Sequence, residues 1–124
     1  MVADVMKTIA GKEELPAKEV FKNIKWMPEM PAGRLLRVMD MGYARSLGVG
    51  CDHCHVPGKW ASDEKSEKVV ARQMAQMVQT INTDLLAKVT GLDNEKAIVN
   101  CTTCHRGQVK PALNLPGPAG AGPR

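Results

Sequence analysis

Four cysteines form two segments of the same spacing, and each segment ends in a histidine. The segments are residues 51–55 (CDHCH) and 101–105 (CTTCH), and they contain every cysteine of the 124-residue chain. C-x-x-C-H is the attachment signal for c-type haem. Two thiols reach the two vinyl groups on one porphyrin edge, and the next residue places an imidazole under the iron. We therefore expect two haem c groups, held by Cys51, Cys54, Cys101 and Cys104, with His55 and His105 as iron ligands.

Zinc binding and disulfide formation are the alternative uses of four cysteines. Zinc accepts tetrahedral sets of cysteine pairs, and an exported chain could instead form two disulfides or redox-active thiols. Neither use requires a histidine after both pairs, in a chain that has only three histidines. Haem attachment takes place on the export side of the membrane. We therefore expect an exported, periplasmic protein, although no signal peptide is recognisable in this chain.

The composition supports a buried cofactor and excludes other classes of protein. Hydrophobic residues make up 44% of the chain but aromatic residues only 3%. Small domains usually rely on aromatic side chains for buried area, so a flat apolar cofactor would supply it here. No apolar run approaches the roughly 20 residues that span a bilayer. The net charge of +4 is not gathered into the basic stripe that nucleic-acid binding requires. We expect neither a membrane span nor a nucleic-acid partner.

Methionine is the natural candidate for the sixth iron ligand. Ligation of both irons by two histidines each would require four histidines, and only His53 remains after the two motif histidines are assigned. Methionine and histidine together raise the reduction potential of a haem. The chain has eight methionines, and four of them lie on two stretches with helical spacing.

The first of these stretches is residues 31–47. Pro31 suits the first turn of a helix and Gly48 suits its end. Met39 falls on the apolar face, whereas Met41 falls among arginines. Only one of the two methionines can face a haem, and Met39 could equally be an ordinary core residue.

The second stretch is residues 62–90, with Ser62 or Ser66 as its cap. Its apolar stripe contains Met74 and Met77, which are three residues apart, so both could face a haem. A methionine stripe at helical spacing is more often part of a core than a set of ligands, so a structural role for both remains open.

The order helix, motif, helix, motif predicts an all-α fold. A further short helix over 93–99 leads into the second motif, and no alternating strand pattern appears. We expect a small dihaem c-type cytochrome with few helices around two covalently bound haems and little or no β-structure. Residues 1–30 would form an N-terminal arm with short helical turns, 31–110 the dihaem module, and 111–124 a Pro/Gly-rich flexible tail.

Four segments of the chain resemble the cytochrome c subunit of photosynthetic reaction centres, in their sequence and in their order. They are residues 21–39 (FKNIKWMPEMPAGRLLRVM), 46–55 (SLGVGCDHCH), 70–82 (VARQMAQMVQTIN) and 101–107 (CTTCHRG). That family carries four haems in two similar halves, and this chain resembles one half. It is also similar to shorter exported two-haem proteins that share the module.

The resemblance implies which methionines bind iron. In the family, a methionine on the helix before the first motif ligates the first haem, and this position corresponds to Met39, with Met41 as the runner-up. The helix between the motifs carries a run of the form R-x-M-x-x-M whose first methionine ligates the second haem. That methionine corresponds to Met74, with Met77 as the runner-up.

These ligands imply an electron carrier rather than an enzyme. The protein would pass single electrons between a redox protein donor and an acceptor, either of which could be membrane-bound, and it would be a monomer or a small oligomer. One alternative is a dihaem enzyme, peroxidase-like or reductase-like, with one open haem. The other is a subunit of a haem-stacking filament, in which His53 would ligate a haem of the neighbouring chain.

Overall fold

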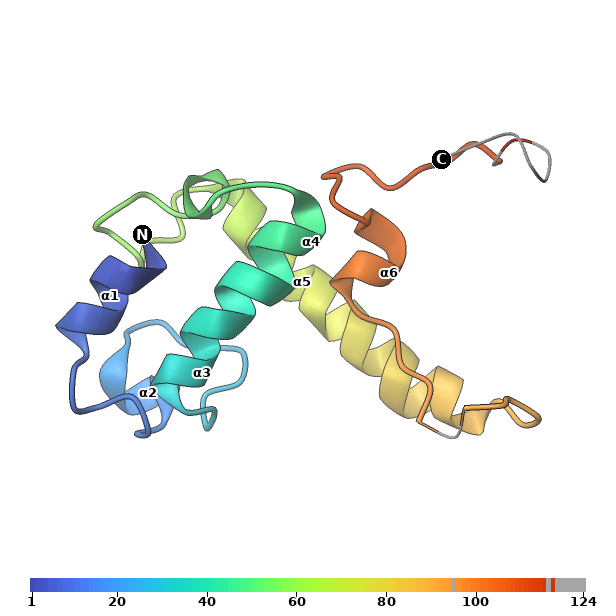
Figure 1. Ribbon diagram of the computed structural model, residues 1–124, viewed down its shortest axis with the longest axis horizontal. Helices are drawn as coiled ribbons and strands as arrows, with labels where there is room; N and C mark the ends of the chain where they lie inside the picture. The colour runs from blue at the N-terminus through green and yellow to red at the C-terminus, as the bar shows by residue number, and fades with distance from the viewer. Residues whose placement is uncertain (95, 116, 118–124) are drawn as a thin grey trace.

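The protein is built from helices that follow one another without a β-sheet, as the computed structural model shows for residues 1–94, 96–115 and 117 (Figure 1). Within these residues only two isolated β-bridges form, Pro16 with Pro31 and Val56 with Lys59. The expected all-α fold is confirmed. Over the same residues, no helix has the length and apolar character that crossing a membrane requires. The α-helices are α1 (Val2–Thr8), α2 (Ala17–Val20), α3 (Ala32–Arg37), α4 (Arg45–Leu47), α5 (Ser66–Thr80) and α6 (Cys101–His105).

The first expected helix forms over residues 32–47 and is confirmed. α3 begins after Pro31, which holds φ at −54°, and continues through the π-helix η1 (Val38–Ala44) into α4. The helix ends at Gly48, which adopts the left-handed φ of 70° that favours glycine. The π-helical stretch is longer than the single turn that is usual for this conformation, and such turns often occur at functional sites.

The second expected helix begins later than predicted. α5 starts at Ser66 with Lys65 as its N-cap and no side-chain cap, so neither Ser62 nor Ser66 caps it. Ser62 instead accepts a hydrogen bond from the backbone N–H of Glu64, and Lys68 donates to the Ser62 carbonyl. These bonds hold residues 62–65, which the sequence predicted to be the first residues of the helix, in a loop. The helix continues through η3 (Ile81–Leu85) and η4 (Leu86–Lys88).

The short helix expected over 93–99 does not form in the described residues of that segment. The side chain of Asn82 donates to the carbonyl of Val99 at 2.9 Å and accepts from its N–H at 2.7 Å. A side-chain amide can satisfy backbone groups that a helix would otherwise pair. Asn82 therefore ties the segment before the second motif to η3 in a non-helical conformation.

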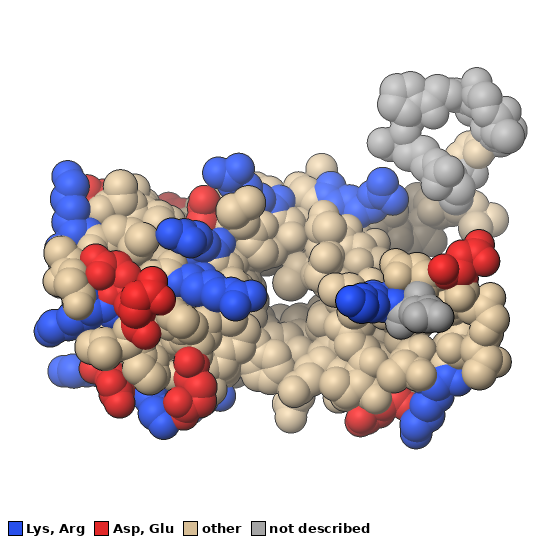
Figure 2. Space-filling model, turned by 60° about the horizontal axis from the view of Figure 1, so that its bottom comes forward, with Lys and Arg blue, Asp and Glu red and all other residues tan. Residues whose placement is uncertain are grey.

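The protein side chains form only a small core. The buried hydrophobic residues are Ile9, Ala17, Ala32, Leu35 and Ala75, and among the described residues no large side chain is fully buried. Figure 2 shows a hollow near the centre of the molecule, surrounded mainly by uncharged surface. The chain encloses space that its own side chains do not fill.

Backbone contacts join segments that lie far apart in the sequence. The N–H of Gly107 donates to the carbonyl of Ser46 at 2.8 Å, which joins α4 to the loop after α6. Near the N-terminus, Ala17 and Ala32 donate to the carbonyls of Met30 and Leu15, so residues 1–30 pack against α3. The division at residues 30 and 110 stays a prediction, and most of the expected tail, 111–124, lies outside the described residues.

Candidate haem-binding sites

Three residues separate the end of α4 at Leu47 from the first C-x-x-C-H segment. Cys51 opens the 3₁₀-helix η2 (Cys51–His53), and the N–H of His55 donates to the carbonyl of Cys51 at 3.0 Å. This bond closes a helical turn. Cys51 and His55 therefore lie on the same side of the turn, as the spacing predicts.

The second segment coincides with α6, which runs from Cys101 to His105. Asn100 caps it: its side chain accepts from the N–H of Thr103 at 3.3 Å, and the Thr103 hydroxyl accepts from the N–H of Asn100 at 2.9 Å. This reciprocal capping box stabilises the first turn of a helix. The helix begins at the first cysteine because its cap is the residue directly before it.

Both motif histidines are oriented by a backbone carbonyl. The Nδ1 of His55 lies 3.0 Å from the Trp60 carbonyl oxygen, and the Nδ1 of His105 lies 2.9 Å from that of Gln108. A carbonyl only accepts, so Nδ1 carries the proton and donates, and Nε2 is left free. This tautomer, anchored by its second nitrogen, is typical of metal-bound histidine.

The environment of His55 favours the neutral imidazole that binds a metal. Burial is the main cause that lowers the pKa of His55, and the positive charges of Lys68 and Arg72 lower it further. The hydrogen bond to the Trp60 carbonyl and the charge of Asp63 act in the opposite direction. The Trp60 ring also meets the imidazole edge to face, with ring centroids 5.6 Å apart.

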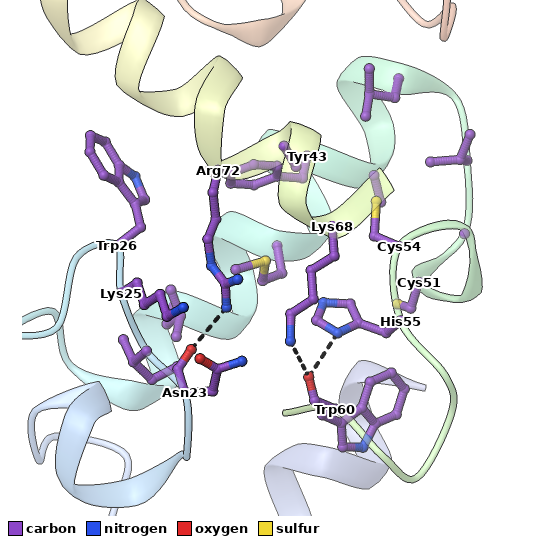
Figure 3. A pocket seen from close by; sticks show the side chains of 18 of the residues that line it. Asn23, Lys25, Trp26, Tyr43, Cys51, Cys54, His55, Trp60, Lys68 and Arg72 are labelled. Carbon is purple, nitrogen blue, oxygen red and sulfur yellow. Dashed lines mark hydrogen bonds between the residues drawn. The ribbon is translucent and has the colours of Figure 1, made fainter. Parts of the chain in front are cut away.

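An open, mainly apolar cavity adjoins the first segment (Figure 3). Met39, Cys51, Cys54 and His55 all line it. Met41 does not line it, and 62% of its surface is exposed. The helix therefore brings Met39, and not Met41, to the cavity of His55.

A second open and mainly apolar cavity adjoins α6. It is lined by Cys101, Cys104 and His105, and by both Met74 and Met77. The structure thus brings the expected ligand residues together but does not separate the two methionines by position.

The two cavities share a wall, which the sequence did not reveal. Tyr43, Leu47, Cys54 and Ala71 line both of them. Burial raises the pKa of Tyr43 to about 12, with smaller contributions from Cys101 and Cys54, so its phenol stays protonated. His53, the histidine outside the motif ends, lines the second cavity.

The residues present fit haem c. All four thiols are free. Cys51 and Cys54 line the first cavity, and Cys101 and Cys104 line the second but not the first, although Cys54 also reaches the second. In the described part of the chain no three His, Cys, Asp or Glu side chains gather as zinc would require. Each cavity is mainly apolar and is bordered by the two thiols and the anchored imidazole of one motif.

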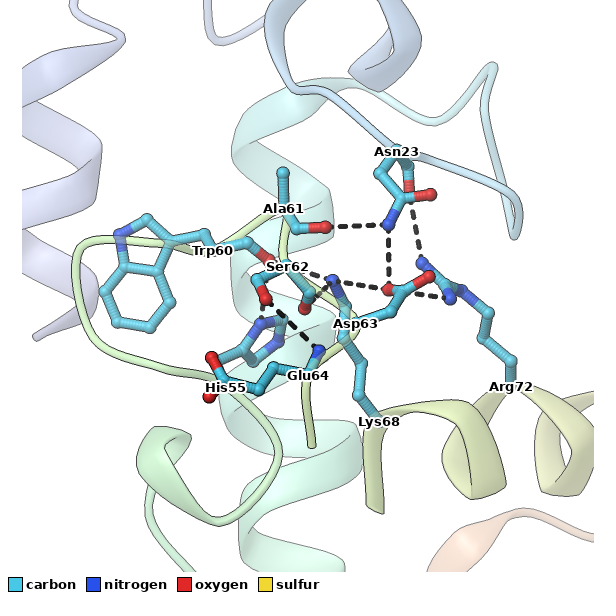
Figure 4. A network of polar contacts seen from close by, with 9 residues as sticks. All are labelled: Asn23, His55, Trp60, Ala61, Ser62, Asp63, Glu64, Lys68 and Arg72. Atoms are coloured by element: carbon cyan, nitrogen blue, oxygen red, sulfur yellow. Dashed lines mark hydrogen bonds and ion pairs between the residues drawn. The ribbon is translucent and has the colours of Figure 1, made fainter. Parts of the chain in front are cut away.

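A polar network surrounds the carbonyl that anchors His55 (Figure 4). Lys68 donates to the Trp60 carbonyl at 3.0 Å and pairs with Asp63 at 3.1 Å. Arg72 donates to Asp63 at 3.0 Å and to the Asn23 carbonyl at 3.1 Å. The hydrogen bonds from Arg72, Lys68 and Asn23 hold the pKa of Asp63 well below its usual range. No local sequence pattern indicates this network, because Asn23 lies 49 residues from Arg72.

Two C-x-x-C-H turns, each presenting an anchored imidazole to an apolar cavity, define a c-type cytochrome. Comparison with known proteins agrees: the sequence model of the photosynthetic reaction centre cytochrome C subunit family matches residues 1–115. The chain belongs to this family.

Individual members of the family and a related cytochrome are similar in sequence to this chain over part of their own length. The photosynthetic reaction center cytochrome c subunits of Thermochromatium tepidum and Roseobacter denitrificans are 38% and 37% identical to this chain, each over 82% of it. Cytochrome c-554 of Chloroflexus aurantiacus is 30% identical over 67% of the chain. The chain covers 25%, 28% and 20% of these three relatives, so it matches about a quarter of their length.

Proposed function

We propose that the chain is a periplasmic electron carrier with two haem c groups. The observation that supports this most directly is the pair of adjoining cavities, each bordered by the two thiols and the anchored imidazole of one motif and by at least one methionine. Haem iron would supply the reversible one-electron change. Cys51, Cys54, Cys101 and Cys104 would hold the two groups, with His55 and Met39 at the first iron and His105 and Met74 at the second.

The chain would contribute fixed ligation and exclusion of water. The Trp60 and Gln108 carbonyls would keep both imidazoles in one orientation in each redox state, and rigid ligation reduces the rearrangement that accompanies a change of charge. The shared wall, including Tyr43 and Leu47, would keep the two groups close enough for exchange of electrons while shielding them from solvent.

The partners would be redox proteins. The family and the names of the relatives support a membrane-associated redox complex as one partner, and the chain would act on the periplasmic side of the membrane as a monomer or small oligomer. Fractionation of the producing cells, followed by light scattering on the purified holoprotein, would check location and size. Recovery of the protein in the cytoplasm would contradict the proposed location, and recovery only as large polymers would contradict the proposed size.

The deciding experiment counts haems and probes their ligands. We expect two haems per chain from the pyridine haemochrome and the intact mass, and no change in the reduced spectrum on adding carbon monoxide. One haem per chain would refute the dihaem assignment. A carbon monoxide shift in about half of the haem would indicate an open iron and favour a peroxidase-like or reductase-like enzyme.

A further inference from the structure

The two cavities differ in the charge of the residues that line them. The charged residues that line the first cavity are all cationic, and they are Lys22, Lys25, Lys68 and Arg72. Among the described residues, Glu67 is the one acidic residue that lines the second cavity, and no lysine or arginine lines it. A positive charge near an iron favours the reduced state, whose own charge is lower, and a negative charge favours the oxidised state.

Lys68 differs from the other cations because it contacts the anchor of the iron ligand. Its Nζ and the Nδ1 of His55 both lie 3.0 Å from the same carbonyl oxygen, that of Trp60 (Figure 3). A carbonyl oxygen has two lone pairs, so it can accept both bonds. Only 11% of the Lys68 side chain is exposed, so solvent screens its charge weakly.

The anchor of the second histidine has no comparable second donor. In the described part of the chain, the Gln108 carbonyl accepts only from Nδ1 of His105. Strong donation from Nδ1–H to an acceptor gives the imidazole partial anionic character and makes it a more basic ligand. A second, cationic donor draws electron density from the acceptor and reduces this effect at His55.

Asp63 offsets part of the positive charge but not all of it. It pairs with Lys68 at 3.1 Å and with Arg72 at 3.0 Å, so one negative charge is shared by two cations. Its carboxylate does not line the cavity. Glu67 lines the second cavity, and its negative charge there would lower the potential of the second haem.

We propose that Lys68 is a positioning residue that holds the reduction potential of the first haem above that of the second, by sharing the Trp60 carbonyl that anchors His55. This inference rests on the dihaem function proposed above. Electrons that enter at the second haem would then move spontaneously to the first.

The first test is a spectropotentiometric titration of the holoprotein and its Lys68 variants. The two haems are assigned by the ferric paramagnetic-resonance signal that disappears in Met39→Ala. We expect the higher midpoint to belong to the first haem, Lys68→Met to lower that midpoint alone, and Lys68→Arg to preserve it. Lys59→Met, an equal charge change at an exposed position directly before Trp60, should leave both midpoints unchanged.

The second test reads the histidine itself. In the Met39→Ala background the first haem is five-coordinate when reduced, and resonance Raman then reports its iron–histidine stretch. We expect Lys68→Met to raise this frequency and Lys68→Arg to leave it unchanged, because a merely structural role for Lys68 would not strengthen the ligand. If Lys68→Met does not assemble, Lys68→Gln retains a donor without the charge and should lower the first midpoint by a smaller shift.

Three results would overturn the proposal while leaving the dihaem function intact. They are a higher midpoint at the second haem of the unaltered protein, an unchanged first midpoint in the neutral variants, and an equal shift in Lys68→Arg and Lys68→Met. A preparation with one haem per chain would instead refute the underlying function. The haem count, taken before the titration, distinguishes the two failures.

Discussion

At the scale of single residues, each proposed iron site has two candidate methionines with different environments. Met39 lines the cavity of His55, and Met41 is largely exposed. Met74 and Met77 both line the cavity of His105, so their assignment depends on the family resemblance. Losing the true ligand would leave one iron five-coordinate.

We expect Met39→Ala and Met74→Ala each to convert one of the two haems to high spin and to open it to carbon monoxide. Met41→Ala and Met77→Ala are the matched controls and should leave both haems low spin. Absorption and paramagnetic-resonance spectra of the ferric proteins would measure this. The reverse pattern within either pair would assign the other methionine as the ligand.

Asp63 should stabilise the fold in a pH-dependent way. Its hydrogen bonds from Arg72, Lys68 and Asn23 depress its pKa in the folded protein. Its contribution is therefore fully present above the ordinary aspartate pKa of about 3.9 and is lost as pH falls towards the depressed value. Asp63→Asn should lower the free energy of unfolding at pH 7, and the difference from the unaltered protein should shrink at acid pH.

Urea denaturation at neutral pH and at pH values below about 4 would check this behaviour. Glu64→Gln, at the neighbouring exposed position, is the control and should not reproduce it. A constant difference between Asp63→Asn and the unaltered protein at every pH would show that the carboxylate charge does not contribute.

At the scale of helices, the close approach of α4 and α6 holds the two motifs together. Gly48 ends α4 with a φ of 70°, and a Cβ built there would lie 2.1 Å from the carbonyl oxygen of Gly107. Gly58 has a similar φ of 81°, but a Cβ built there would have no atom within 4 Å. Substitution at Gly58 would therefore introduce backbone strain alone, whereas substitution at Gly48 would add a clash with Gly107.

We expect Gly58→Ala to cost about 1 to 2 kcal/mol, which is the usual penalty for a left-handed non-glycine residue. Gly48→Ala should cost clearly more, because the helix end and the loop after α6 must also move apart. Chemical denaturation of the two holoprotein variants would compare them. Equal costs would show that the contact with Gly107 adds nothing to stability.

At the scale of the whole molecule, the protein's own core is too small to hold the fold. Its few buried hydrophobic residues are mostly small, and large apolar side chains such as Met74, Met77 and Val70 are partly exposed around the cavities. Small domains bury a modest share of their surface even when their interior is filled. The haem faces would therefore supply much of the missing buried apolar area.

We expect the chain with all four cysteines changed to alanine to lose cooperative unfolding, because it cannot attach haem. Calorimetry and near-ultraviolet circular dichroism, compared with the holoprotein, would measure this. A sharp thermal transition with native-like aromatic signals in the variant would show that the protein side chains alone determine the fold.

The sequence by itself determined the chemistry of the two motifs and the helical class of the fold. Cys51, Cys54 and His55 lie within five residues, as do Cys101, Cys104 and His105, so local spacing is enough to bring each set together. Pro31 and Gly48 likewise mark the limits of the first helix through local backbone preferences. The prediction of a short helix over 93–99 was wrong, because the side chain of Asn82 pairs with the backbone of Val99.

Only the tertiary structure decided how the segments meet. It placed Met39, which the sequence already put on an apolar face, at the cavity of His55, within a π-helical stretch that the sequence did not indicate. It also placed Tyr43 in the wall between the cavities and brought Asn23, Asp63 and Arg72 into one network. The physical reason is that these contacts join residues far apart in the chain, so their partners are chosen by packing around a shared hollow interior and not by local spacing.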